Sequence, residues 1–206
     1  MRATTTRVTT WAAVGGVCGL AWAASFRAYM AEISGAISAV HWVGTFLALL
    51  LPGAIIGVAL GASAVADPVR HRRALHWAAS APLLFAAFPL ALPGALVDFL
   101  TQGLGGGALG VALAAIAGGY AIGGRRTWAR WTCGLLAVLL LAGIAASVPS
   151  IAGAALAFTT PRGMWVVVLA LSLLLVLYVA AAIPFRRLNA PYRAGQAADA
   201  SSATAS

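Results

Sequence analysis

The stretch Asp67-Pro-Val-Arg-His-Arg-Arg-Ala-Leu-His76 is a short basic segment between two long apolar runs. It holds three of the thirteen arginines of a chain that has no lysine. In membrane proteins, short loops that are rich in arginine stay on the cytoplasmic side. The stretch therefore indicates where the neighbouring runs begin and end relative to a membrane, and every other segment can be placed against it.

The composition of the chain is that of a protein embedded in lipid. Of its 206 residues, 62% are hydrophobic and 8% are charged, and the mean hydropathy is +0.96. A soluble domain has about 25% charged residues, and a small domain leaves too much surface exposed to hide this apolar excess. We therefore expect lipid to surround most of the chain. The abundance of alanine and the lack of lysine suggest a bacterial genome of high GC content.

The net charge of +9 raises the question of a nucleic-acid partner. The arginines lie in short clusters between apolar runs, and there is no soluble basic domain to hold a nucleic acid. We interpret the charge as a determinant of membrane topology, with attraction to anionic lipid headgroups as a consequence. No nucleic-acid partner is expected.

Six apolar runs have the length of about 20 residues that a membrane-spanning helix needs. Helix is expected because backbone groups in hydrocarbon must be satisfied within their own segment. The fold class is therefore all-α, a polytopic bundle of six membrane-spanning helices within residues 1–187, followed by a disordered cytoplasmic tail at 188–206. The predicted spans are residues 8–26, 42–64, 75–97, 104–122, 131–148 and 164–185.

The arginines fall on one side of these six spans. Only Arg27 and Arg162 are left for the other side, so both termini are expected in the cytoplasm and the protein in the inner (plasma) membrane of a bacterium. The eleven arginines on the cytoplasmic side are Arg2, Arg7, Arg70, Arg72, Arg73, Arg125, Arg126, Arg130, Arg186, Arg187 and Arg193.

The first span has an alternative interpretation. Arg2, Arg7, the apolar stretch and Ala21-Trp-Ala23 resemble a cleavable signal peptide, whose removal would leave five spans. The apolar stretch continues to Phe26, however, which is spanning length and longer than a usual signal peptide. We favour a retained first helix.

Small residues recur every four positions in two spans. Such stripes let helix backbones approach closely in lipid. They could form a contact with a second copy or with another membrane protein, or they could pack within the chain's own bundle. We favour packing within the bundle, because six helices need several close contacts with one another. The residues are Gly53, Gly57 and Gly61 in the second span, and Gly106, Gly110, Ala114 and Gly118 in the fourth.

Prolines interrupt the second and third spans. Pro52 lies in the second span, and Pro82, Pro89 and Pro93 lie in the third. Each removes a backbone donor and kinks its helix. Broken helices build the binding sites of some transporters, although proline is also ordinary in membrane helices.

Polar side chains gather on the predicted outer face. A pocket for a polar ligand is one interpretation, and Glu32 with His41 could act as an acid–base pair. The interpretation that we favour is a set of solvated loop residues that pair loosely. The candidates are Arg27, Tyr29, Glu32, His41, Asp98 and Arg162.

The sequence carries no signature of an enzyme: it has no DxxD, HExxH, GxSxG or P-loop motif. No ionisable residue falls near the centre of a predicted span, which disfavours an ion-coupled transporter. We therefore expect a non-enzymatic membrane component that acts through helix packing with a partner or a second copy, with no cofactor and no metal. The alternative is a small transporter or channel that uses the kinked second and third spans.

Overall fold

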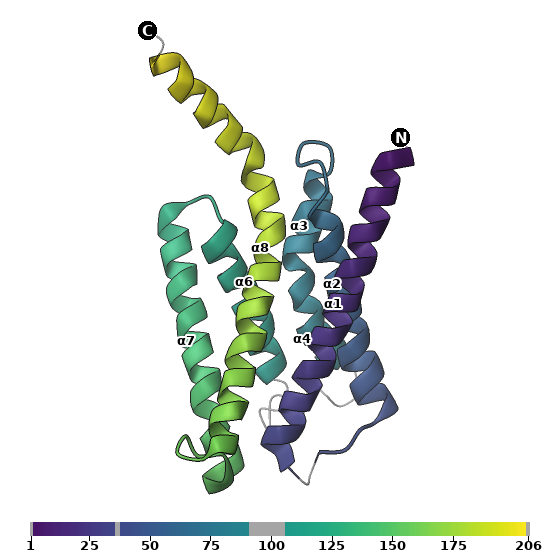
Figure 1. Ribbon diagram of the computed structural model, residues 1–206, viewed down its shortest axis with the longest axis vertical. Coiled ribbons are helices and arrows are strands. Elements are labelled where there is room, and N and C mark those ends of the chain that lie inside the picture. Colours follow the sequence, from purple (N-terminus) through teal and green to yellow (C-terminus); the bar gives the residue numbers. More distant parts are fainter. Residues whose placement is uncertain (1, 36–37, 91–105, 205–206) are drawn as a thin grey trace.

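Long apolar runs become long helices in the computed structural model, which describes residues 2–35, 38–90 and 106–204. Every regular element in these ranges is a helix, so the predicted all-α fold is confirmed (Figure 1). In chain order the elements are α1 (Arg2–Ser34), the π-helix η2 (Trp42–Leu50), α2 (Leu51–Ser63), α3 (Arg72–Ser80), the 3-10 helix η3 (Ala81–Leu83), α4 (Leu84–Leu90), α6 (Gly106–Gly123), α7 (Thr127–Ala152), the 3-10 helix η4 (Gly153–Leu156) and α8 (Pro161–Thr204).

Four helical segments are long and apolar enough to cross a membrane, and each contains or closely matches one of the predicted spans. The chain therefore has the helices of a membrane-embedded protein. The other two predicted spans, 75–97 and 104–122, extend into residues outside the described ranges. The four segments are Thr6–Ser34, Trp42–Ser63, Thr127–Leu156 and Pro161–Ala190.

Two of the prolines coincide with changes in helix type. The π-helix η2 gives way to α2 at Leu51, and Pro52, which has no N–H to donate to the preceding turn, lies at this junction. Between α3 and α4, Pro82 lies within the 3-10 helix η3. Because Pro82 cannot donate to the carbonyl four residues earlier, the turn tightens there. Pro89 falls within α4, and Pro93 lies outside the described residues.

Helix α8 is the element on which both halves of the bundle pack. Its buried side chains recur at three- and four-residue steps and contact α1, α6 and α7. In Figure 1, α8 lies between the α6–α7 pair and the group formed by α1, α2 and α3. The buried residues of α8 are Gly163, Val166, Val167, Ala170, Leu173, Leu174, Leu177, Tyr178, Ala181, Ala182 and Pro184.

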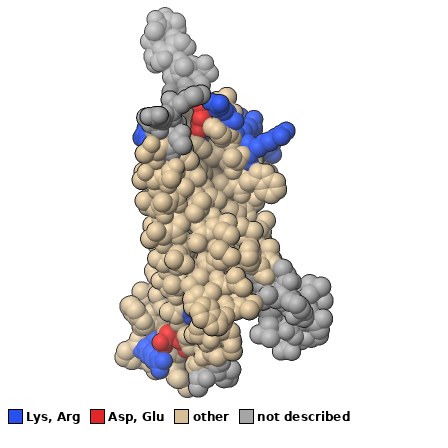
Figure 2. All heavy atoms as spheres, turned by 90° about the vertical axis from the view of Figure 1, so that its right-hand side faces the viewer, with Lys and Arg blue, Asp and Glu red and all other residues tan. Residues whose placement is uncertain are grey.

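The two chain termini lie at the same end of the bundle, together with the α2–α3 and α6–α7 connections (Figure 1). On the face that Figure 2 shows, charged side chains lie near the two ends of the molecule, and uncharged side chains cover the length between them. We call the end with the termini the basic end, because it holds Arg70, Arg72, Arg73, Arg125 and Arg126. This arrangement is the one that the arginine pattern predicts.

Side chains from α7 and α8 satisfy the last carbonyls of other helices at the basic end. The Arg187 guanidinium donates to the carbonyl of Ala64, which ends α2. Asn189 donates to the carbonyl of Gly123 over 2.6 Å, and Arg130 donates to that of Ala121 over 2.9 Å. These bonds satisfy carbonyls at helix C-termini that have no partner within their own helix. The two arginines also place positive charge at the negative end of the helix dipole.

Helix α8 extends to Thr204 and so covers most of residues 188–206, for which the sequence predicts a disordered tail. Alanine is frequent in this segment, and it has the highest helix propensity of the amino acids.

Candidate functional site

The start of α8 places Arg162 at the end of the molecule opposite the basic end. The Thr160 hydroxyl accepts a hydrogen bond from the Gly163 N–H (3.0 Å) and donates to the Ala157 carbonyl (2.9 Å). Thr160 is thus the N-cap of the helix, and Pro161 occupies the first helical position, where its fixed φ is suited to the helix. Arg162 follows in the first turn.

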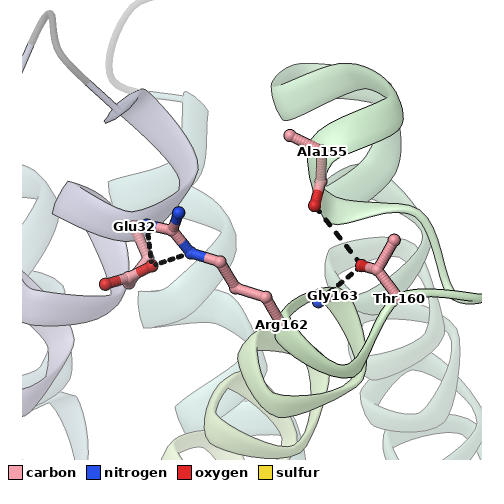
Figure 3. A network of polar contacts seen from close by, with 5 residues as sticks. All are labelled: Glu32, Ala155, Thr160, Arg162 and Gly163. Carbon is pink, nitrogen blue, oxygen red and sulfur yellow. Dashed lines mark hydrogen bonds and ion pairs between the residues drawn. The ribbon is translucent and has the colours of Figure 1, made fainter.

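Arg162 forms an ion pair with Glu32 from the end of α1 (Figure 3). Its Nε and Nη2 atoms donate to Oε2 of Glu32 over 3.1 and 2.9 Å. A cation is unfavourable in the first turn of a helix, and the carboxylate offsets it. The side chains are 66% and 37% exposed, respectively, so the pair contributes at most about 1 kcal/mol. It connects the end of α1 to the start of α8.

Arg27 serves the connection that follows α1. Its guanidinium donates to the Ser38 hydroxyl over 3.0 Å and to the Ala39 carbonyl over 2.7 Å. Gly35 has a φ of +56°, a conformation that suits glycine and that ends α1. His41 is exposed at the start of η2, where its carbonyl accepts the N–H of Thr45.

Tyr29 is a core residue, with 4% of its surface exposed. It packs with Val148, Leu156 and Val166, and its ring lies 5.9 Å from that of Phe26. This burial places Tyr29 among the apolar groups that hold α1 against α7 and α8.

The predicted outer-face candidates do not converge on a single pocket. Glu32 forms an ion pair with Arg162, Arg27 donates hydrogen bonds to the connection that follows α1, and Tyr29 is buried in the core. Within the described residues no hydrogen bond joins Glu32 to His41. Asp98 lies outside the described residues. Each of the engaged groups connects one part of the chain to another.

The glycine stripe of α2 packs against α1. A methyl group built on Gly57 would lie 2.9 Å from the Cα of Gly19, and one built on Gly61 would lie 3.0 Å from the Cα of Gly15. One built on Gly53 would lie 2.5 Å from the Ala23 side chain. The backbones of α1 and α2 are therefore in direct contact, which only glycine allows. Of the two predicted roles, these three glycines take the internal one.

The stripe of α6 is divided between two environments. A methyl group on Gly118 would overlap the ring of Tyr178, so this glycine packs against α8. Gly110 has no atom of the described residues within 4 Å of such a methyl group. Gly106 is the first residue of α6, and its surroundings lie outside what the structure describes.

The polar groups of two aromatic side chains connect helices within the bundle, and for Tyr178 a bond to its own or a neighbouring helix is the role that its place in an apolar span predicts. The Trp22 indole donates to the Leu173 carbonyl over 2.8 Å, and its ring stacks on Phe26 with centroids 5.2 Å apart. The Tyr178 hydroxyl donates to the Ala137 carbonyl over 2.9 Å. In the sequence, Trp22 lies only slightly deeper in its predicted span than the other tryptophans, which fall near the ends of their runs.

A groove of about 720 Å³ lies between the start of α1, the second half of α2 and the α3–η3–α4 segment. We call it the α2–α3 groove. Its polar lining residues are Ser63, His71 and Ser80. His71 belongs to the basic stretch that joins α2 to α3.

The basic stretch is held by Asp67. Oδ1 of Asp67 accepts the N–H groups of Val69 (2.8 Å) and Arg70 (3.2 Å). These two bonds, with the positive charge of His71 and Arg70 nearby, hold the pKa of the Asp67 carboxyl below its usual value. The turn that they form directs the chain from α2 into α3.

Comparison with known protein families, with characterised proteins and with solved structures gives no match to this chain. Its function must therefore be inferred from the geometry. Across the described residues, the engaged polar side chains stabilise helix ends, turns and helix–helix contacts, and the α2–α3 groove is lined mainly by apolar residues.

Proposed function

We propose that the protein is a six-span protein of a bacterial plasma membrane with both termini in the cytoplasm. Support comes from the gathering of both termini and the arginine-rich connections at one end of the bundle (Figure 1). The packing of α1 against the glycines of α2 also supports a retained first helix, because its removal would expose that glycine face.

Within the membrane, the protein acts as a non-enzymatic component that packs laterally against a partner protein or a second copy. One observation carries this proposal: α7 has 26 residues but buries only Ala137 and Val148. Its outward face combines long apolar side chains with small residues, and no described residue comes within 4 Å of a methyl group built on Gly143. A second helix could approach closely there. The long exposed side chains of this face are Leu135, Leu136, Val138 and Leu139.

The test is extraction of the protein into native lipid particles, followed by mass spectrometry of what stays bound. The proposal expects a stoichiometric partner or a dimer, and it expects Gly143→Leu to release it because the larger side chain holds the second helix away. Gly44→Leu is the matched control, since a methyl group built on Gly44 also has no neighbour within 4 Å in the part of the chain that the structure describes. A protein that is monomeric and free of protein partners would contradict the proposal, as would equal retention by both variants.

A small transporter is the second candidate, and the interrupted helices favour it. The π-helix η2 before Pro52 and the 3-10 helix η3 at Pro82 lie in neighbouring segments of the bundle, and broken helices line the sites of many transporters. A cysteine placed at Ile56 or Ala86, both buried, tests for a water pathway. Labelling by a membrane-impermeant thiol reagent would favour transport, and protection would favour the component.

A further inference from the structure

The α2–α3 groove has the size and lining of a site for an apolar chain. Its volume of about 720 Å³ lies within the range of about 300–1,000 Å³ that is typical of ligand pockets. Seven of its fifteen lining residues are alanines, and their short side chains leave the space that longer ones would fill. The groove therefore results from the alanines on the helices that face each other across it.

The groove is lined by both buried and exposed side chains. Its floor consists of buried side chains, among them Leu75 at 1% exposed and Ala78 at 5%. Its rim includes Trp77 at 78% exposed and Leu83 at 43%. A helix face in this position is surrounded by lipid, so a lipid chain can enter laterally without crossing the bundle.

The arginines of the basic stretch adjoin one end of the groove, and in the part of the chain that the structure describes Arg72 and Arg73 have no carboxylate partner. His71 and Ala74 line the groove, and the exposed Arg70, Arg72 and Arg73 flank them in sequence. Within the described residues, Arg72 and Arg73 form no ion pair. The Asp67 carboxylate of the same stretch is engaged by two backbone N–H groups.

We propose that the α2–α3 groove binds one anionic phospholipid, with an acyl chain along the alanine-lined floor and the phosphate at Arg72 and Arg73. Arginine forms strong charge-assisted hydrogen bonds to phosphate. Basic residues at the cytoplasmic surface also attract anionic lipid. The exposed indole of Trp77 lies at the rim, and tryptophan is enriched at the level of lipid headgroups.

The charge of the groove disfavours a second copy of this chain as the occupant. A copy docked at this end would bring its own basic stretch toward Arg72 and Arg73, and like charges repel. The chain has four acidic residues in all, of which Asp67 is engaged locally and Glu32 pairs with Arg162 at the opposite end. The proposal goes beyond the lateral packing of α7 and does not depend on it.

The experiment measures lipid retained by the purified full-length protein in detergent, using native mass spectrometry. Phosphatidylglycerol and phosphatidylcholine with identical acyl chains are titrated separately. The proposal expects at least tenfold more retained phosphatidylglycerol than phosphatidylcholine, as one bound molecule. Equal retention of the two lipids would overturn it.

Variants assign the bound lipid to the groove. Arg72→Gln/Arg73→Gln should lower phosphatidylglycerol retention about tenfold, whereas Arg126→Gln/Arg186→Gln, which removes the same charge from exposed positions outside the groove, should retain it. Equal effects of the two pairs would show that charge at the basic end attracts lipid without a site, and would overturn the proposal.

A second pair of variants tests the acyl-chain floor without altering charge. Ala74 lines the groove and is exposed, so Ala74→Leu should fill space without disturbing the core. Ala142→Leu is the control, because Ala142 is exposed on α7. Ala74→Leu should reduce retention several-fold relative to Ala142→Leu. Unchanged retention in Ala74→Leu would also overturn the proposal.

Discussion

Replacing Gly57 with alanine should destabilise the protein, although alanine favours helix. The added methyl group would lie 2.9 Å from the Cα of Gly19 and even closer to the carbonyl oxygen of Gly15. Both obstacles are backbone atoms, so α1 and α2 must separate along their contact. Overpacking of this kind costs about 1–3 kcal/mol, whereas glycine-to-alanine replacement in an open helix position contributes about 0.5–1 kcal/mol of stability.

The measurement is the midpoint of thermal unfolding of the purified protein in one detergent, followed by tryptophan fluorescence. For a chain of this size each 1 kcal/mol corresponds to about 2–4 °C, so Gly57→Ala should lower the midpoint by up to about 10 °C. Gly110→Ala is the control: Gly110 lies within α6, and among the residues that the structure describes none comes within 4 Å of an added methyl group, so this replacement should raise the midpoint slightly.

The double variant Gly15→Ala/Gly57→Ala sharpens the test. The two glycines touch each other, so once the first methyl group has separated the helices the second enters space already opened. Its effect should therefore be smaller than the sum of the single effects. If Gly57→Ala is as stable as Gly110→Ala, or if the two glycine replacements are additive, α1 and α2 do not pack as described.

Three further predictions concern the ends of the bundle. A double-mutant cycle with Glu32→Ala and Arg162→Ala should give a coupling energy of about 0.2–1 kcal/mol that declines with added salt; a coupling above about 2 kcal/mol would show that the pair is more buried than its exposure indicates. Thr160→Ala removes the N-cap bond to the Gly163 N–H and should cost about 1 kcal/mol in thermal unfolding, with Thr160→Ser close to wild type. The Asp67 carboxyl should titrate below its ordinary pKa of 3.8 because it accepts two N–H groups; its contribution to stability is present above the unfolded pKa and is lost as pH falls through the lower folded value. Carbon-detected NMR of labelled Asp67 checks this, and a midpoint at or above 3.8 would contradict it.

The length and hydropathy of the apolar runs were sufficient to predict the all-α fold. Lipid leaves helix as the structure in which such a run can satisfy its own backbone. The arginine clusters likewise indicated which connections lie together at one end. These signals are local in sequence, and so they can be seen without knowing which helices touch.

Contacts between helices were harder to predict. The stripe at Gly53, Gly57 and Gly61 was evident, but the matching residues Gly15 and Gly19 on α1 were missed, although they share the four-residue spacing. The spacing of small residues shows that one face of a helix can be approached closely. Only the packed structure shows which face of which other helix packs against it.

The candidate site depended even more on three-dimensional packing. The outer-face residues looked alike in sequence, yet Tyr29 is buried, Arg27 binds its own loop and Glu32 meets Arg162 from a distant part of the chain. The α2–α3 groove gave no signal, because alanines that line a cavity have the same sequence pattern as alanines that fill a core.

The central claim is that this bundle crosses the membrane six times with its basic end in the cytoplasm, and reporter fusions test it most directly. Alkaline phosphatase, which is active only outside the cytoplasm, and green fluorescent protein, which fluoresces in the cytoplasm, are each fused after Gln102 and after Arg126. The account predicts phosphatase activity at Gln102 and fluorescence at Arg126. The same side for both positions, or the reverse assignment, would contradict it.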